Sequence, residues 1–210
     1  MDIPAFFAAS MDRRTVCVDS VFNGMSPTPS SGTVPLQDIS DRIRGEVRAP
    51  VVAIDHVSLV KRSFDASLTK HLRIRGTEPW LMTHIRTVDD VFDAFNGSAD
   101  MLLAPLHGLE SRMELKDIQS VSDSFVPVVY CIGSKSVGIR GIRSGISEEL
   151  EGLVDIGLYR ACVMDCDGSI GSDTWKGLAE EYPSTIPFVT DASRTVSGFE
   201  NRVSIIPLRR

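Results

Sequence analysis

One stretch of the sequence decides the fold: ACVMDCDGSIGSDTWKGLAEEYPSTIPFVT, residues 161–190. It places a short apolar run before a helix-like segment and a second apolar run after it. Ser172 or Asp173 marks the start of the helical segment, and Pro183 marks its end. A strand, a helix and a strand in this order predict a βα unit of a parallel sheet.

The same alternation continues along the rest of the chain. Apolar, β-branched runs that predict strands lie at 15–18, 51–54, 80–83, 101–104, 126–131, 161–164, 186–190 and 203–206. Helix-like segments lie between them, such as TVDDVFDAF at 87–95, which opens with a capping-box pattern. Because these strands are apolar nearly throughout, they fit a sheet that is covered on both faces.

Eight such units in 210 residues predict an α/β protein with one domain, residues 1–210. The expected fold is a compact (β/α)8 TIM barrel that lacks most of its eighth helix, and a doubly wound open parallel sheet is the alternative. Residues 3–9, or a second subunit in a homodimer, would cover the flank that the missing helix leaves bare. Two Gly- and Ser-rich segments, 24–32 and 133–145, are expected to be loops at the carboxyl face.

Composition excludes several classes of protein. The chain is 42% hydrophobic and carries a net charge of −6, which is typical of a folded, non-fibrous protein and unfavourable for binding nucleic acid. No apolar run approaches the length of about 18 residues that spans a bilayer. The opening MDIPAFFAAS has no basic residue, so it does not resemble a secretory signal, and we expect a cytoplasmic protein with reduced cysteines.

Acidic side chains follow several of the predicted strands. Asp19 follows the first, Asp55 the second, and Asp165 and Asp167 the sixth. Carboxylates gathered at a barrel rim can act as base and acid on a substrate between them. The alternative is that they cap the helices that follow, and for Asp55 we favour this cap.

Two histidines also follow strands, His84 the third and His107 the fourth. An imidazole at a barrel rim contacts substrate or stabilises a turn, and we expect both groups to titrate near neutrality. Cys166 lies between two aspartates, which raise the pKa of a thiol, so we interpret it as structural.

Four stretches carry a resemblance to a known family. PWLMTHIRTVDDVFDAFNGSADMLLAPLHGLES (79–111) resembles the third and fourth βα units of the HisA/HisF-type barrels of histidine biosynthesis, and residues 161–196 resemble the sixth and seventh. VCVDSVFNG (16–24) is similar to the opening strand of that family, and VVAIDHVSLV (51–60) to its second. The pattern is most similar to the uncharacterised HisA-related proteins of methanogens and methylotrophs.

The resemblance implies that Asp19 is a catalytic carboxylate, because it matches the first-strand aspartate of the family isomerases. Their second aspartate lies on the fifth strand, where this chain has Tyr130, Cys131 or Ile132. Asp167 is then the candidate for the second carboxylate. Substrate contacts are expected from the residues that follow the third, sixth and seventh strands: His84, Arg86, Asp165, Ser169, Ser193 and Arg194.

The family substrate carries two phosphates, which backbone N–H groups of glycine-rich turns hold. Here Pro105 and Pro207 lack that donor, and Asp191 would repel a phosphate dianion. The sequence therefore argues against a substrate with two phosphates. We expect a small-molecule ligand, with phosphorylated compounds still among the candidates, and neither a resident cofactor nor a metal ion.

Two functions stay open, and the sequence does not decide whether the protein is an enzyme. One is an isomerase or lyase of small-molecule metabolism that uses Asp19 and Asp167. The family resemblance would link it to the pathways of one-carbon cofactors such as methanopterin and methanofuran. The other is a catalytically degenerate barrel that binds a ligand or serves as an enzyme subunit, which the lost glycines and the missing fifth-strand aspartate favour.

Overall fold

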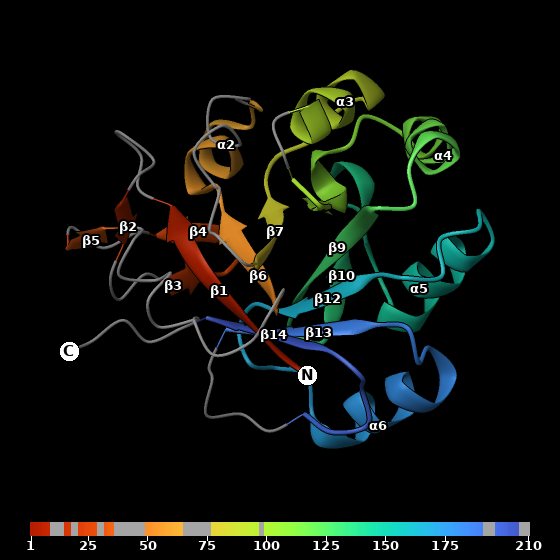
Figure 1. The fold of residues 1–210 in the computed structure, drawn as a ribbon. Helices are drawn as coiled ribbons and strands as arrows, with labels where there is room; N and C mark the ends of the chain where they lie inside the picture. Colours follow the sequence, from red (N-terminus) through yellow and green to blue (C-terminus); the bar gives the residue numbers. More distant parts are fainter. Residues whose placement is uncertain are drawn as a thin grey trace.

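The computed structural model of the chain describes residues 1–8, 15–17, 21–28, 32–35, 49–64, 77–96, 99–190 and 196–205. At its centre is a closed ring of parallel β-strands (Figure 1). Around the ring the strands are β1 (Asp2–Ala8), β6 (Ala49–Ile54), β7 (Thr77–Met82), β8 (Met101–Pro105), β9 (Phe125–Ile132), β12 (Cys162–Asp165), β13 (Ile186–Val189) and β14 (Arg202–Ile205). The parallel pairing of β14 with β1, in which Asp2 lies opposite Arg202, closes the ring. This architecture confirms the predicted TIM-barrel fold and excludes the open sheet.

Helices lie around the outside of the ring, as Figure 1 shows. The described residues include five α-helices: α2 (His56–Lys61), α3 (Val88–Asn96), α4 (Arg112–Val121), α5 (Ile146–Val154) and α6 (Ser172–Glu181). The described part of the barrel therefore has fewer than eight helices, as predicted. None of these helices has the length and apolar composition that crossing a bilayer requires.

Strand β1 shows why the ring strands are apolar on both faces. Successive side chains of a strand point to opposite sides. Ile3, Ala5 and Phe7 belong to the cluster inside the ring, whereas Phe6 and Ala8 belong to the cluster between the ring and the helices. All five residues are at most 3% exposed. A strand in this position therefore requires a nearly continuous apolar run.

The first strand of the ring is not the predicted one. The prediction placed it at 15–18 and assigned residues 3–9 to the flank of the barrel, but DIPAFFA (2–8) is itself the first ring strand. β2 (Thr15–Cys17) runs antiparallel to β1 outside the ring, with Cys17 opposite Phe7, and also pairs with β5 (Thr33–Pro35). Of the two apolar runs, β1 is the longer, with seven residues against three in β2, and it provides the run that is buried on both faces.

The two segments expected to be loops contain hairpins. After β9 the chain turns at Gly133 and Ser134, whose φ angles are 58° and 60°, and continues into β10 (Lys135–Val137) and β11 (Arg143–Ser144). Positive φ at both central residues is what a two-residue hairpin turn requires. In the first segment, β3 (Val21–Asn23) pairs with β4 (Ser26–Thr28), and residues 29–31 lie outside the described part of the chain.

Candidate functional site

Two imidazoles and a phenol ring come together at the carboxyl end of the barrel. His84 follows β7, His107 lies in the short 3-10 helix η2 (Leu106–Gly108) after β8, and Tyr130 belongs to β9. The ring centroids of His107 and Tyr130 are 5.0 Å apart. TIM barrels place their functional groups at the carboxyl ends of the strands. These three residues therefore form the candidate site.

Gly108 explains why His84 can lie so close to η2. A Cβ atom at position 108 would lie 2.9 Å from both Cε1 and Nδ1 of His84, and 3.2 Å from the carbonyl oxygen of Ile85. Any residue larger than glycine would displace the imidazole of His84, which is 3% exposed. The glycine at the end of η2 thus lets the histidines of two neighbouring strands approach each other.

Burial fixes the protonation states of the site. Desolvation, together with the nearby charges of His84 and Arg62, lowers the pKa of His107 to about 4. Desolvation also lowers the pKa of His84, partly opposed by Asp90. Burial raises the pKa of Tyr130 well above its ordinary value. At neutral pH both imidazoles are therefore uncharged and the phenol keeps its proton, whereas the sequence predicted histidines that titrate near neutrality.

Two polar atoms of this site are buried without a partner. Among the described residues, no group forms a hydrogen bond with the hydroxyl of Tyr130 or with Nδ1 of His107. A buried polar atom left unpaired costs about 1–3 kcal/mol, and such atoms are rare in folded proteins. Both atoms are therefore suited to bind a polar group of a small molecule at the carboxyl end of the barrel.

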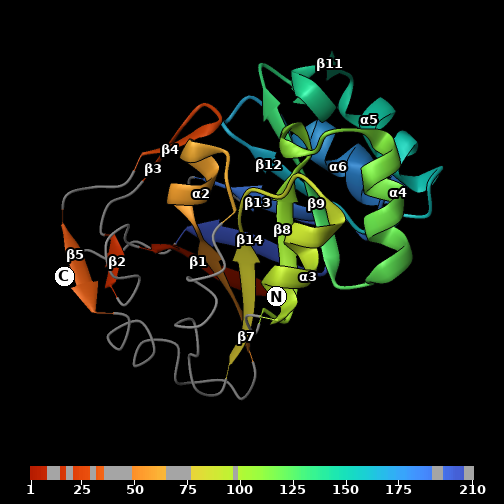
Figure 2. The ribbon, with the colours of Figure 1, turned by 90° about the horizontal axis from the view of Figure 1, so that it is seen from above.

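The side chain of Phe22 fills the mouth of the barrel above the site. It comes from the β3–β4 hairpin, which lies beside α2 (Figure 2). Its ring centroid is 5.3 Å from that of Phe7 and 6.3 Å from those of Tyr130 and Phe188. Phe22 is 9% exposed. The interior of the barrel is therefore covered at the end where the candidate site lies.

The structure places Asp167 and Ser169 in a contact between two turns. The carboxylate of Asp167 accepts hydrogen bonds from the backbone N–H groups of Gly133 (2.9 Å) and Ser169 (3.1 Å). The backbone N–H of Ser134 donates to Oγ of Ser169 at 2.8 Å, and the Ser134 hydroxyl donates to the Ser169 carbonyl at 2.9 Å. Both predicted site residues thus hold the β9–β10 turn against the turn after β12.

The pKa of Asp167 is lowered from its ordinary value of 3.8. Partial desolvation acts to raise it, but hydrogen bonds from Ser169 and from the backbone N–H of Gly133 outweigh that effect. The carboxyl group is therefore ionised at neutral pH. In this state it can accept a proton but has none to donate.

Asp165 is the last residue of β12, whereas Asp167 lies in the turn that follows the strand. The alternation of the strand puts Asp165 on the face of Val163, which packs between the ring and the helices. Its carboxylate accepts a hydrogen bond from the backbone N–H of Ile170 at 3.5 Å, and its carbonyl accepts one from the hydroxyl of Thr190 at 3.2 Å. Asp165 thus stabilises the turn that leads to α6.

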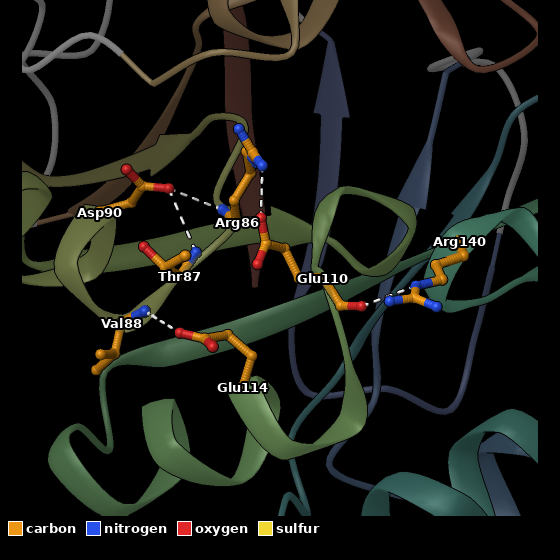
Figure 3. A network of polar contacts seen from close by, with 7 residues as sticks. All are labelled: Arg86, Thr87, Val88, Asp90, Glu110, Glu114 and Arg140. Atoms are coloured by element: carbon orange, nitrogen blue, oxygen red, sulfur yellow. Dashed lines mark hydrogen bonds and ion pairs between the residues drawn. The ribbon is translucent and has the colours of Figure 1, made fainter.

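Arg86 lies in a network of polar contacts at the rim of the barrel (Figure 3). Its guanidinium pairs with the carboxylate of Glu110, while its backbone N–H donates to Asp90 at 2.9 Å. Nε of Arg140 donates to the Glu110 carbonyl at 2.9 Å. The side chains of Arg86 and Glu110 are 56% and 48% exposed, so this ion pair contributes little to stability. The network connects the loops that follow β7, β8 and β10.

Asp55 caps α2, as the sequence indicated. Its carboxylate accepts hydrogen bonds from the backbone N–H of Ser58 at 3.3 Å and from the Ser58 hydroxyl at 2.6 Å.

Cys131, Cys162 and Cys166 are buried free thiols. Burial raises the pKa of Cys166 to about 12, and the charges of Asp165 and Asp167 act in the same direction. These thiols are therefore unreactive, as predicted for Cys166.

Three predicted site residues lie outside the described residues: Asp19, Ser193 and Arg194. Their roles stay predictions. Within the described residues, no three His, Cys, Asp or Glu side chains come together as a metal ion would require.

No model of a known protein family matches the chain, and no curated protein matches its sequence.

Sequence reasoning reached the candidate site only in part. The sequence selects His84 as a substrate contact, leaves His107 as either a substrate contact or a turn residue, and gives Tyr130 no function. Phe22 was missed, because its position depends on a hairpin folding over the barrel and no local pattern signals that. For Tyr130 the available signal was its place near the carboxyl end of a buried strand, where a phenol ring faces the interior.

Proposed function

We propose that the protein is a small-molecule enzyme of the isomerase or lyase type, and that its reaction moves a proton at the carboxyl mouth of the barrel. One observation carries the proposal: the hydroxyl of Tyr130 and Nδ1 of His107 are buried together without a described hydrogen-bond partner. An uncharged imidazole and a phenol can each donate a hydrogen bond to an oxygen on which negative charge develops.

The proposed reaction begins with loss of a proton from a carbon next to a substrate carbonyl. Asp19, the base that the family resemblance implies, takes this proton while the carbonyl oxygen becomes an enolate oxygen. His107 and Tyr130 stabilise that oxygen. Return of the proton to a different carbon gives an isomer, whereas departure of a neighbouring group gives a lyase product. Asp167 is the proposed second carboxylate, and because it is ionised it must gain a proton before it gives one.

The resemblance to HisA-related proteins suggests which compounds to try first. They are sugar phosphates, pterins and furans, the last two because of the proposed link to one-carbon cofactors. A ligand at about 100 times its dissociation constant adds about 2.7 kcal/mol to the free energy of unfolding, which a thermal-shift assay detects. Each stabilising compound is then incubated with the protein in D2O and followed by proton NMR.

The proposal expects deuterium to enter the bound compound at the carbon next to its carbonyl. Tyr130→Phe should slow this exchange about 100-fold, because it removes one donor to the developing oxyanion. Tyr159→Phe is the matched control, because Tyr159 is 70% exposed and should leave the exchange rate unchanged. Exchange at the same rate in Tyr130→Phe would exclude the proposed role of the phenol.

A second function is favoured by Phe22, which fills the barrel mouth. A barrel covered in this way would serve as a ligand-binding protein or a subunit of an enzyme. The same experiment separates the two functions. A compound that stabilises the protein without exchanging deuterium would support binding without catalysis.

A further inference from the structure

We infer that the barrel mouth is a binding site for a flat aromatic ring that carries a polar substituent, and that Phe22 occupies the place of this ring. The inference deepens the proposed function, since it rests on the carboxyl mouth being the ligand site. It assigns a class of ligand: an aromatic or heteroaromatic ring with a hydroxyl, carbonyl or amino group on its edge.

Three rings surround the place that Phe22 occupies. Tyr130 and Phe188 meet its ring edge to face, at interplanar angles of 81° and 78°, and Phe7 lies tilted at 47°. They belong to β9, β13 and β1, three separate strands of the rigid ring. Edge-to-face packing is specific to aromatic rings. The mouth is therefore shaped for a flat ring rather than for any apolar group.

The hairpin that supplies Phe22 is attached to the barrel by side chains. In the described part of the chain, β3 and β4 pair only with each other and form a separate two-stranded sheet. Phe22 and Met25 pack against the interior cluster, and Pro27 is buried. As far as the described residues show, Phe22 can therefore leave the mouth without breaking a backbone hydrogen bond between the hairpin and the barrel.

A ligand ring with a polar edge gains a contact that Phe22 cannot provide. The ring of Tyr130 has Phe22 at 6.3 Å and His107 at 5.0 Å. The Tyr130 hydroxyl and Nδ1 of His107 are buried and have no described partner, and the hydrocarbon ring of Phe22 cannot bond to either. A hydroxyl or carbonyl group on the ligand ring could form a hydrogen bond with one of these two atoms. This difference would allow the ligand to displace Phe22.

Three probes of similar size test the inference: phenol, toluene and cyclohexanol. Their dissociation constants are measured by NMR titration with the wild-type protein, with Phe22→Ala and with the double variant Phe22→Ala/Tyr130→Phe. Phenol should bind Phe22→Ala at least ten times more tightly than wild type, and more tightly than toluene or cyclohexanol. In the double variant the preference for phenol over toluene should fall, because only Nδ1 of His107 is left to bond with the hydroxyl of phenol.

Equal binding of phenol and cyclohexanol to Phe22→Ala would overturn the inference, because it would indicate an unspecific apolar hollow. No gain over wild type would overturn it as well. Should Phe22→Ala fail to fold, Phe22→Leu retains apolar bulk without a ring and should still bind phenol more tightly than wild type. Deuterium exchange on a non-aromatic compound would support the proposed function even if phenol did not bind, so the two failures are distinguishable.

Discussion

The carboxylate of Asp167 accepts a hydrogen bond of 2.9 Å from the backbone N–H of Gly133, which lies 34 residues earlier in the chain. This contact holds the β9–β10 hairpin turn against the turn after β12. A residue that the sequence presents as a candidate acid or base therefore connects two neighbouring units of the barrel rim.

We predict that Asp167→Ala lowers the free energy of unfolding by about 1 kcal/mol at neutral pH, because two backbone N–H groups at an exposed site lose their acceptor. The lowered pKa of Asp167 means that this contribution is fully present above pH 3.8 and is lost as the pH falls through the folded-state pKa. Urea unfolding at several pH values measures it. Asp117→Ala on α4 is the control, and an equal loss there would contradict the prediction.

The low pKa of His107 predicts that stability depends on pH. The unfolded chain binds a proton near pH 6.5 and the folded chain only near pH 4, so the contribution is fully present above 6.5 and is lost between 6.5 and about 4. The free energy of unfolding should fall by up to about 3 kcal/mol over this pH interval. His107→Asn should flatten the dependence of the unfolding free energy on pH in this interval.

The coupling between the two histidines can be measured separately. The charge of His84 lowers the pKa of His107, so His84→Asn should raise the pKa of His107. An NMR titration of the imidazole resonances measures the pKa of His107 in the wild type and in His84→Asn. An unchanged pKa of His107 would mean that the two imidazoles do not interact.

Gly108→Ala should destabilise the protein by about 1–3 kcal/mol, because the new Cβ would lie 2.9 Å from the buried imidazole of His84. Gly177→Ala is the matched control in α6, where no heavy atom lies within 4 Å of the new Cβ. Alanine favours a helix, so this control should stabilise by about 0.5–1 kcal/mol. Thermal unfolding should show a lower melting temperature than wild type for Gly108→Ala and a higher one for Gly177→Ala.

Tyr130→Phe should leave the protein as stable as wild type or stabilise it by about 1 kcal/mol, because the hydroxyl that it removes is buried without a described partner. Tyr182→Phe offers a contrast, since the Tyr182 hydroxyl donates to the carbonyl of Ser147 at 3.3 Å. That variant should lose a few tenths of a kcal/mol. A clear loss in Tyr130→Phe, measured by urea unfolding, would show that the hydroxyl is bonded in the folded protein.

Much of the fold could be predicted because parallel strands buried on both faces leave a strong local pattern. Runs such as VPVVYC (126–131) and ACVM (161–164) are apolar throughout, and the ring uses both. The prediction failed at the first strand, where DIPAFFA and TVCV are both apolar runs. Periodicity does not distinguish a ring strand from a short antiparallel strand beside it.

The site was less predictable than the fold. Asp165 and Asp167 come after a strand, which suggests a catalytic rim, but hydrogen bonds with Ile170, Ser169 and Gly133 engage them in turns. No spacing in the sequence shows whether an aspartate after a strand contacts a substrate or a backbone N–H. That depends on how closely neighbouring turns approach each other.

Local sequence was enough to specify the parallel βα architecture, the cap formed by Asp55 and the burial of Cys131, Cys162 and Cys166. Each of these follows from local composition, because burial on two faces and helix capping are properties of short segments. The tertiary structure alone decided that β1 closes the ring, that Phe22 fills the mouth, and that His107 and Tyr130 face each other. These depend on contacts between residues far apart in the chain, whose energies come from packing and desolvation that no single segment encodes.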